Sequence, residues 1–157
     1  MKKYILLGIT GIIFLSVILT FAASKVTEKD VIKLVDQAVK LIEKQGELAI
    51  KTIADPKGPF YVSSKSLYVF IYDENCVIKA HPYKPTLVGR SYRGKPDVRG
   101  KKFRDEIVQK ALEKGQGWTE YSYQKPGDSG IFKKKVFGKR ATVGKKHFIV
   151  CAGMYMD

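Results

Sequence analysis

The chain opens with an apolar run that is clearly set off from the polar sequence after it. Two lysines precede an uncharged, mostly apolar segment from Tyr4 to Ala23, and charged residues become frequent from Lys25 onward. A short basic stretch before an apolar run is typical of an export signal. A run of about 20 apolar residues is also long enough to span a bilayer. We expect residues 1–23 to be either a cleaved signal peptide or an N-terminal membrane anchor, with membrane association only in the second case.

Both outcomes place residues 24–157 outside the cytoplasm, in the periplasm or another extracytoplasmic space. These 134 residues (157 − 23) are enough for one domain with its own hydrophobic core and too few for two. Internal repeats and low-complexity segments are absent from the sequence. We therefore expect a single domain.

Apolar residues at helical spacing follow the export segment. The stretch from Thr27 to Asp30 resembles a capping box with Asp in place of Glu or Gln, which marks the start of a helix. The apolar positions after it recur every three to four residues, which predicts one long amphipathic helix over 27–53. Gly46 weakens this helix without ending it. Pro56 disfavours helical geometry at the residue before it and stops the helix.

The rest of the sequence predicts strands around one further helix. A hairpin is expected from an apolar run, a polar turn and a second short strand, and His81-Pro82 ends it because proline cannot donate to a strand ladder. Glycines, prolines and charges make residues 83–102 an irregular loop, and helical spacing returns over 102–114. The expected strands cover residues 67–72, 76–80, 117–123, 131–142 and 146–155. This order favours an α+β fold with a five-stranded antiparallel sheet and helices segregated to one face.

The net charge of the chain limits the class of partner that it is expected to bind. The formal net charge is +14, and +12 remains when Lys2 and Lys3 are left out (14 − 2). Such a balance favours an anionic partner, either a carboxylate ligand, an anionic lipid or a nucleic acid, or else a surface tuned for solubility. Export removes the usual nucleic-acid target, so we expect no nucleic-acid binding.

The chemistry-bearing residues do not predict an enzyme. Cys76 and Cys151 are the full cysteine complement, and they form either a disulfide or two buried free thiols. With only His81 and His147 to join them, a structural metal site is not expected, and nothing predicts a cofactor. The sequence shows no paired carboxylates, Ser/His/Asp arrangement or phosphate-binding loop in a suitable context. A thiol inside an apolar strand, as at Cys151, is normally inert.

Several short motifs nevertheless occur in a recognisable order. They are Tyr68-Val69-Phe70-Ile71-Tyr72-Asp73 leading to His81-Pro82, then Leu87-Val88-Gly89, Gly117-Trp118 followed by Tyr121 and Tyr123, Lys134, and Gly153-Met154-Tyr155. In order and spacing they resemble the single Cache domain, the PAS-like extracytoplasmic sensor of bacteria and archaea, over residues 28–157. The resemblance implies a long N-terminal helix on a five-stranded sheet with a short helix insert. It also implies a cavity for a small organic anion between the sheet and the loop-and-helix insert.

Two departures from the family pattern carry further expectations. The family usually has glycine where this chain has Cys76, which implies that Cys76 and Cys151 cross-link adjacent strands. Many relatives continue into a transmembrane helix and a signalling domain, whereas this chain stops at Asp157. It therefore resembles the freestanding members, for which a membrane histidine kinase or a chemoreceptor is the expected partner.

The resemblance and the chemistry of carboxylate binding together point to seven site residues. A buried carboxylate needs cationic or N–H donors and apolar walls. His81 is the expected donor, with a plain turn residue as the alternative, and Lys134 the expected point charge, with a solvated lysine run as the alternative. Phe70, Tyr72 and Trp118 are expected to line the cavity, with core packing as the alternative for each. One of Tyr121 and Tyr123 is expected to offer its hydroxyl to the ligand, and the family motif favours Tyr123.

Strand alternation adds a condition to this set. It sends Tyr121 and Tyr123 to one face of their strand and Trp118 to the other, unless a bulge lies near Gly117. The function that follows is a binding module that senses a small organic carboxylate and passes its state to a separate partner. The alternative is a Cache-fold protein without a cavity that docks an acidic protein or an anionic membrane surface.

Overall fold

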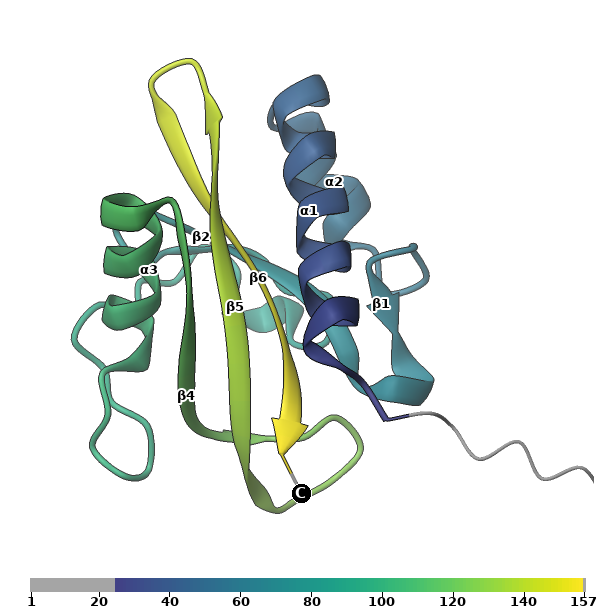
Figure 1. The fold of residues 1–157 in the computed structure, drawn as a ribbon, viewed down its shortest axis with the longest axis vertical. Coiled ribbons are helices and arrows are strands. Elements are labelled where there is room, and N and C mark those ends of the chain that lie inside the picture. Colours follow the sequence, from purple (N-terminus) through teal and green to yellow (C-terminus); the bar gives the residue numbers. More distant parts are fainter. Residues whose placement is uncertain (1–24, 157) are drawn as a thin grey trace, which may run out of the picture.

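The computed structural model describes residues 25–156, and the segment expected to be a signal peptide or anchor lies outside these residues. The described residues form an antiparallel sheet in the order β1-β2-β6-β5-β4 (Figure 1). The short strand β3 also pairs with β2, on the edge away from β6. The strands are β1 (Tyr61–Val62), β2 (Leu67–Asp73), β3 (Ile78–Ala80), β4 (Gln116–Gln124), β5 (Ile131–Val143) and β6 (Lys146–Met156). The α+β class is confirmed. The sixth strand, β1, has two residues, too few to produce a periodic pattern.

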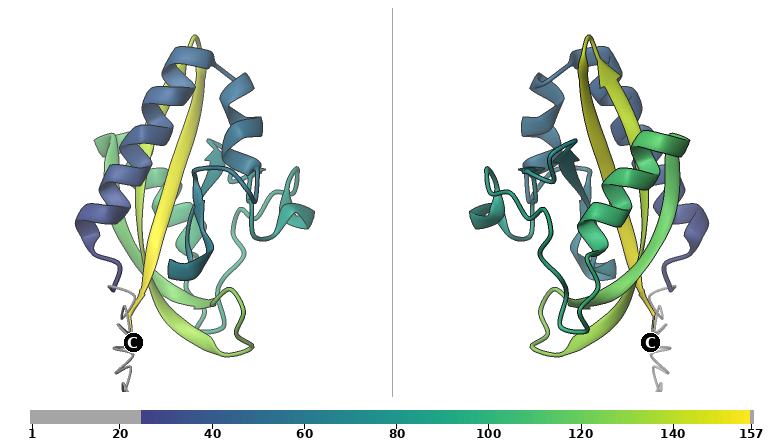
Figure 2. Two further views of the ribbon diagram at one scale, coloured as in Figure 1. Left: turned by 90° about the vertical axis from the view of Figure 1, so that its right-hand side faces the viewer. Right: turned by 90° about the vertical axis from the view of Figure 1, so that its left-hand side faces the viewer.

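The expected long helix is two helices. α1 (Glu28–Gln45) starts at the predicted capping box, in which Asp30 N–H donates to the Thr27 hydroxyl and the Asp30 carboxylate accepts from Thr27 N–H. It ends at Gly46, whose φ of +62° and ψ of −144° suit only glycine. α2 (Leu48–Ala54) then begins in a new direction (Figure 2). The single helix over 27–53 was therefore wrong at Gly46, which ends α1.

Helices cover both faces of the sheet, not one as expected. α1 and α2 lie against one face, whereas α3 (Phe103–Lys114) and the loop before it lie against the other (Figure 2). The alternation of β2 explains both layers. Val69 and Ile71 pack in the hydrophobic core between the sheet and α1 and α2, which we call the α1 core. Tyr68, Phe70 and Tyr72 pack in the core between the sheet and α3. We call the second side of the sheet the α3 face.

The expected disulfide is not formed, because Cys76 and Cys151 are both buried free thiols. Cys151 lies on β6 opposite Phe70 of β2, whereas Cys76 lies in the turn before β3. Since β3 pairs with the other edge of β2, β2 separates the two cysteines and they are not cross-strand neighbours. Cys76 also has a φ of +58°, a left-handed conformation that favours glycine and accounts for the glycine in the family pattern.

Candidate functional site

The α3 face contains a buried lysine among aromatic rings. Lys134 of β5 is 1% exposed, and its Nζ donates a hydrogen bond of 2.9 Å to the hydroxyl of Tyr68. Four ring centroids surround this ammonium, Tyr68 at 4.3 Å, Tyr155 at 4.9 Å, Phe70 at 5.4 Å and Tyr123 at 5.7 Å. Rings at these distances attract a cation through their electron-rich faces. We call these four residues the aromatic cage.

The strand register explains why only one lysine of the run 133–135 is buried. Lys134 pairs with Tyr121 of β4 and Tyr155 of β6, both of which face α3. Its neighbours point to the opposite face by alternation. Lys133 is exposed, and Lys135 forms a 2.6 Å ion pair with Glu28 at the start of α1. The alternative of three solvated lysines therefore does not describe Lys134.

The charge of Lys134 has no acidic partner. Within residues 25–156, no carboxylate lies within ion-pair distance of its Nζ, and its one hydrogen bond is to a neutral hydroxyl. Burial, together with the nearby cation of Lys84, lowers the pKa of Lys134 to about 7. A buried ammonium is costly unless it is paired. A small anion would supply the missing partner.

His81 lies beside the cage as a neutral ring. It is 5% exposed, stacks on Phe70 at 5.7 Å between centroids, and accepts a 3.0 Å hydrogen bond at Nδ1 from the backbone N–H of Lys84. Burial lowers its pKa to about 3, and the cations of Lys134 and Lys84 add to the effect. Since Nδ1 accepts, the proton of the neutral ring belongs on Nε2, which makes that atom a hydrogen-bond donor.

The loop after His81 closes the outer side of the cage. Lys84 donates from Nζ to the Gln124 side chain at 2.8 Å, and this Nζ lies 5.3 Å from the ring centroid of Tyr123. Further along, the Asp97 carboxylate accepts from the backbone N–H of Ser122 on β4 at 2.8 Å. These two contacts attach the loop 83–102 to β4, and the backbone of residues 89–92 also bonds to Cys76 and Ile78.

A buried arginine that the sequence interpretation missed completes the site. Arg104 of α3 is 7% exposed, and its guanidinium carbon lies 4.1 Å from the Phe103 ring centroid and 4.6 Å from that of Tyr92. Its Nε is buried without a hydrogen-bond partner among the described residues. A signal existed in the sequence, because Arg104 stands three and four residues before Ile107 and Val108 and shares their buried helix face.

The other predicted site residues divide between the two faces. Phe70 belongs to the cage, and Tyr72 is buried next to it on β2. Tyr121 is 6% exposed and stacks on Phe103 with centroids 3.8 Å apart, while Tyr123 belongs to the cage. The β4–β5 register runs without a shift from Gln116 to Gln124, so no bulge redirects the strand.

Trp118 consequently lies on the face opposite the cage. It is half-buried against the α1 core, with its ring centroid 5.1 Å from that of Phe137. The Lys135 ammonium lies over the same ring at 5.1 Å. The structure thus brings six of the seven predicted residues to the α3 face and leaves out Trp118, which has the core position that was the alternative.

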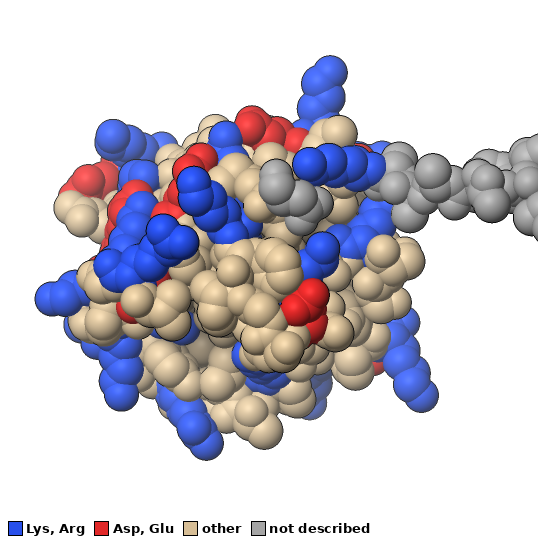
Figure 3. All heavy atoms as spheres, turned by 90° about the horizontal axis from the view of Figure 1, so that it is seen from below, with Lys and Arg blue, Asp and Glu red and all other residues tan. Residues whose placement is uncertain are grey.

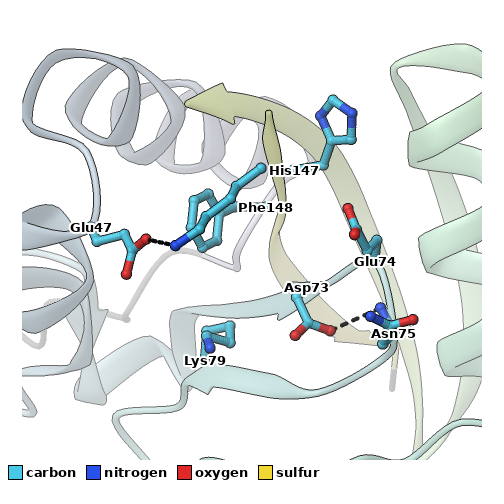
Figure 4. A pocket seen from close by; sticks show the side chains of 8 residues that line it. Glu47, Asp73, Glu74, Asn75, Lys79, His147 and Phe148 are labelled. Carbon is cyan, nitrogen blue, oxygen red and sulfur yellow. Dashed lines mark hydrogen bonds and ion pairs between the residues drawn. The ribbon is translucent and has the colours of Figure 1, made fainter. Parts of the chain in front are cut away.

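A separate cavity of about 210 Å³ lies at the other end of the sheet (Figure 4). Its lining carries charges of both signs, among which Lys146 pairs with Glu47, and the Asp73 carboxylate accepts from Asn75 N–H at 2.8 Å. Asp73 and Phe148 lie at the ends of β2 and β6 that are far from Tyr68 and Tyr155. This cavity is therefore distinct from the site around Lys134.

Two further searches gave negative results for the described part of the chain. Over residues 25–156, no three His, Cys, Asp or Glu side chains gather closely enough to hold a metal ion. In the same residues, no helix is long and apolar enough to cross a membrane.

Comparison with family models identifies the family of this chain. Residues 12–157 match the sequence model of the family described as Single Cache domain 2. The chain belongs to this family. No curated protein is significantly similar to this chain.

Solved structures of Cache and chemotaxis sensor domains share the fold. A periplasmic sensor domain of a chemotaxis protein has a TM-score of 0.71 and 24% identity, over 82% of this chain and 94% of that one. A methyl-accepting chemotaxis protein from Vibrio parahaemolyticus RIMD 2210633 has a TM-score of 0.65 and 19% identity, over 82% and 88%. A Cache chemosensory domain, described in terms of carboxylic acid recognition, has a TM-score of 0.67 and 26% identity, over 82% and 92%. This Cache chain therefore belongs with sensor and binding domains.

Proposed function

We propose that this Cache domain binds a small organic carboxylate beside Lys134 and passes its bound state to a separate signalling partner. The observation that carries the proposal is the fully buried ammonium of Lys134, which has no carboxylate partner in residues 25–156. Carboxylic acid recognition by the Cache chemosensory domain that is 26% identical to this chain supports the choice of ligand class.

The arrangement suits a carboxylate on chemical grounds. Lys134 supplies the charge, and the neutral His81 can donate from Nε2–H without adding a second one. The hydroxyl of Tyr68 accepts from Lys134 and keeps its own proton, since burial raises its pKa well above the usual value. Aromatic walls exclude water and so strengthen each of these polar contacts.

Ligand entry needs movement of the loop 83–102. Tyr68 and Lys134 are each 1% exposed, so the cage is closed around its own side chains. The exposed and irregular segment outside it is this loop, which is fixed through Lys84 and Asp97. Coupling between binding and loop position gives the domain two states that a ligand can bias.

A route from the site to the start of α1 lies in adjacent residues of β5. Lys134 faces the cage, and Lys135 pairs with Glu28 in the first turn of α1 on the other face. A shift of β5 on binding would therefore be felt at the N-terminal end of the domain. We infer that residues 1–23 export the chain as a signal peptide or anchor and that residues 24–157 form the sensing domain. The expected partner is a membrane histidine kinase or a chemoreceptor.

The face of the molecule in Figure 3 does not show a basic patch suited to docking a membrane or an acidic protein. On the face shown in Figure 3, lysines and arginines are spread around the rim and separated by uncharged surface. Several lysines elsewhere are paired with acidic residues, as Lys139 is with Asp36 at 2.7 Å. A docking patch would require a gathered array of one sign.

A thermal-shift screen at pH 6 tests the proposal. Short-chain and hydroxy carboxylates are compared with their uncharged amides at millimolar concentration, and at least one acid should raise the melting temperature where its amide does not. Lys134→Met should abolish the shift, while the exposed neighbour Lys133→Met should keep it. An acid that stabilises the Lys134→Met variant as strongly as the wild type would overturn the proposal, as would a screen without any stabilising acid.

A further inference from the structure

We propose that the outer edge of β4 is an interaction surface for a second copy of this chain, and that Asp97 blocks this edge while the loop 83–102 is closed. In the described residues β4 pairs with β5 alone, so the nine-residue strand leaves one edge of its backbone at the end of the sheet. The opposite end of the sheet is covered, because β1 and β3 both pair with β2. An unpaired strand edge is a template for the addition of another strand, and proteins usually protect it.

The register of β4 identifies the backbone groups at this edge. The N–H of Arg140 on β5 donates to the carbonyl of Gly115 at 2.8 Å, and the register then continues without a shift to the end of β4. Because the hydrogen-bonded positions alternate along an antiparallel strand, Trp118, Glu120 and Ser122 direct their N–H and C=O groups away from β5. Within residues 25–156, the N–H and C=O of Glu120 and the C=O of Ser122 have no hydrogen-bond partner outside the sheet.

Asp97 caps this edge from the loop. One oxygen of its carboxylate accepts from the Ser122 N–H at 2.8 Å, and the other accepts from the backbone N–H groups of Arg99 and Lys101, each at 2.9 Å. A cleft of about 160 Å³ separates this part of the loop from Glu120. The proposed function moves the same loop on ligand entry, so ligand binding would also free the Ser122 N–H.

An antiparallel pair of β4 strands, related by a twofold axis at Tyr121, satisfies these backbone groups. Glu120 of one copy then lies opposite Ser122 of the other, and the two residues exchange both of their hydrogen bonds. The twofold axis repeats this exchange on the other side of Tyr121, and a twofold contact is the commonest form of homodimer. The ladder closes without Trp118, whose carbonyl already accepts from Lys110 Nζ at 2.7 Å.

The charges beside the edge favour this register and a second copy as the occupant. Glu120 and Lys133 are exposed, and neither has an ion-pair partner within residues 25–156. Lys133 lies opposite Ser122 on β5, on the face of the sheet that Glu120 shares. In the dimer, Glu120 of the second copy lies beyond the small Ser122 side chain, about 10 Å from Lys133 between backbones, which the two long side chains can span. A register with Glu120 opposite itself would place like charges together.

Sedimentation velocity of the purified protein, without ligand and from micromolar to millimolar concentration, tests the inference. Asp97→Asn keeps an oxygen for the loop N–H groups but turns an amide donor toward the Ser122 N–H, and Asp97→Ala removes the cap. Both variants should dimerise with a dissociation constant at least tenfold lower than that of the wild type. Asp55→Ala is the matched control, because Asp55 is an exposed aspartate that also accepts from a backbone N–H, that of Lys57 at 2.9 Å. It should behave as the wild type does.

A charge exchange tests the register and the occupant. In the Asp97→Asn background, Glu120→Lys should weaken the dimer by placing a cation near Lys133, and the further change Lys133→Glu should restore it. Asp97 variants that stay monomeric at millimolar concentration, or whose dimer ignores the charge at position 120, would overturn the inference. A monomeric variant that binds a synthetic peptide of alternating valine and threonine would assign the edge to another protein and overturn it as well. Since no ligand is present, failure here leaves carboxylate binding to be decided by the thermal-shift screen.

Discussion

The ammonium of Lys134 and the hydroxyl of Tyr68 lie 2.9 Å apart, and each side chain is 1% exposed. The two residues come from β5 and β2, with β6 between them in the sheet. Their contact joins an ammonium to a neutral hydroxyl on the buried α3 face. Proteins usually avoid an unpaired buried charge unless a ligand or another function requires it.

This pair should cost the ligand-free domain stability. The double variant Lys134→Met with Tyr68→Phe replaces the charge and its partner by apolar groups of similar size. We expect the free energy of unfolding at pH 6 to rise by about 1 to 4 kcal/mol, as for other buried charged groups replaced by well-packed apolar ones. Urea unfolding without ligand measures the change. A less stable double variant would show that the lysine contributes to folding and is not maintained for binding.

The pH dependence of stability should report the state of Lys134. Its pKa is about 7 in the folded protein against an ordinary 10.5, so above pH 7 the unfolded chain binds more protons at this residue than the folded one. Stability from this residue therefore rises with pH, by up to about 1.4 kcal/mol per unit. Urea unfolding between pH 7 and 8, below the ordinary pKa of about 8.5 at which the thiols of the unfolded chain titrate, should show the rise in the wild type. The slope should be absent in Lys134→Met, and equal slopes would contradict a lowered lysine pKa.

His81 should make the domain sensitive to acid. Burial lowers its pKa to about 3 from 6.5, so between these values the unfolded chain takes up a proton that the folded ring does not. The stabilisation is complete above pH 6.5 and is lost as the pH falls toward 3, at up to about 1.4 kcal/mol per unit. His81→Asn keeps an acceptor for the Lys84 N–H and cannot titrate. Its unfolding free energy should fall less steeply with acid than that of the wild type, and parallel curves would show that His81 already binds a proton in the native state.

The two thiols should be unreactive in the native domain. Cys76 and Cys151 are unbonded and buried, and burial raises the pKa of Cys76 to about 11. We expect the same melting temperature with and without a reducing agent, and slow labelling by a thiol reagent until the protein unfolds. A melting temperature that falls by several degrees on reduction would indicate a disulfide.

Local patterns in the sequence predicted most elements of this fold but not every contact between them. The strands and α3 follow from period and turn residues, which act over a few positions. The division of the first helix depends on the left-handed φ of Gly46. The spacing of apolar residues gives no sign of that backbone conformation. The cysteine pairing was wrong because it required the order of strands, and β2 separates the two residues.

The parts of the candidate site that depend on local patterns were also predictable, whereas those that depend on contacts between elements were not. Alternation separated Tyr121 and Tyr123 from Trp118, and the regular β4–β5 register keeps them apart. The burial of Lys134 within a lysine run depended on which face of β5 meets the second layer, which the sequence does not show. Arg104 was missed because a charged residue in a first helical turn is usually solvated, although its spacing to Ile107 and Val108 placed it on the buried face.

A crystal structure of the domain with its tightest-binding carboxylate tests the central claim most directly. The account predicts a carboxylate oxygen within about 2.7 to 3.2 Å of Lys134 Nζ, the usual range for such a bond, with the aromatic cage around the ligand and the loop 83–102 displaced from its ligand-free position. A ligand bound elsewhere on the domain, with Lys134 still bonded to Tyr68 inside an unchanged cage, would contradict it.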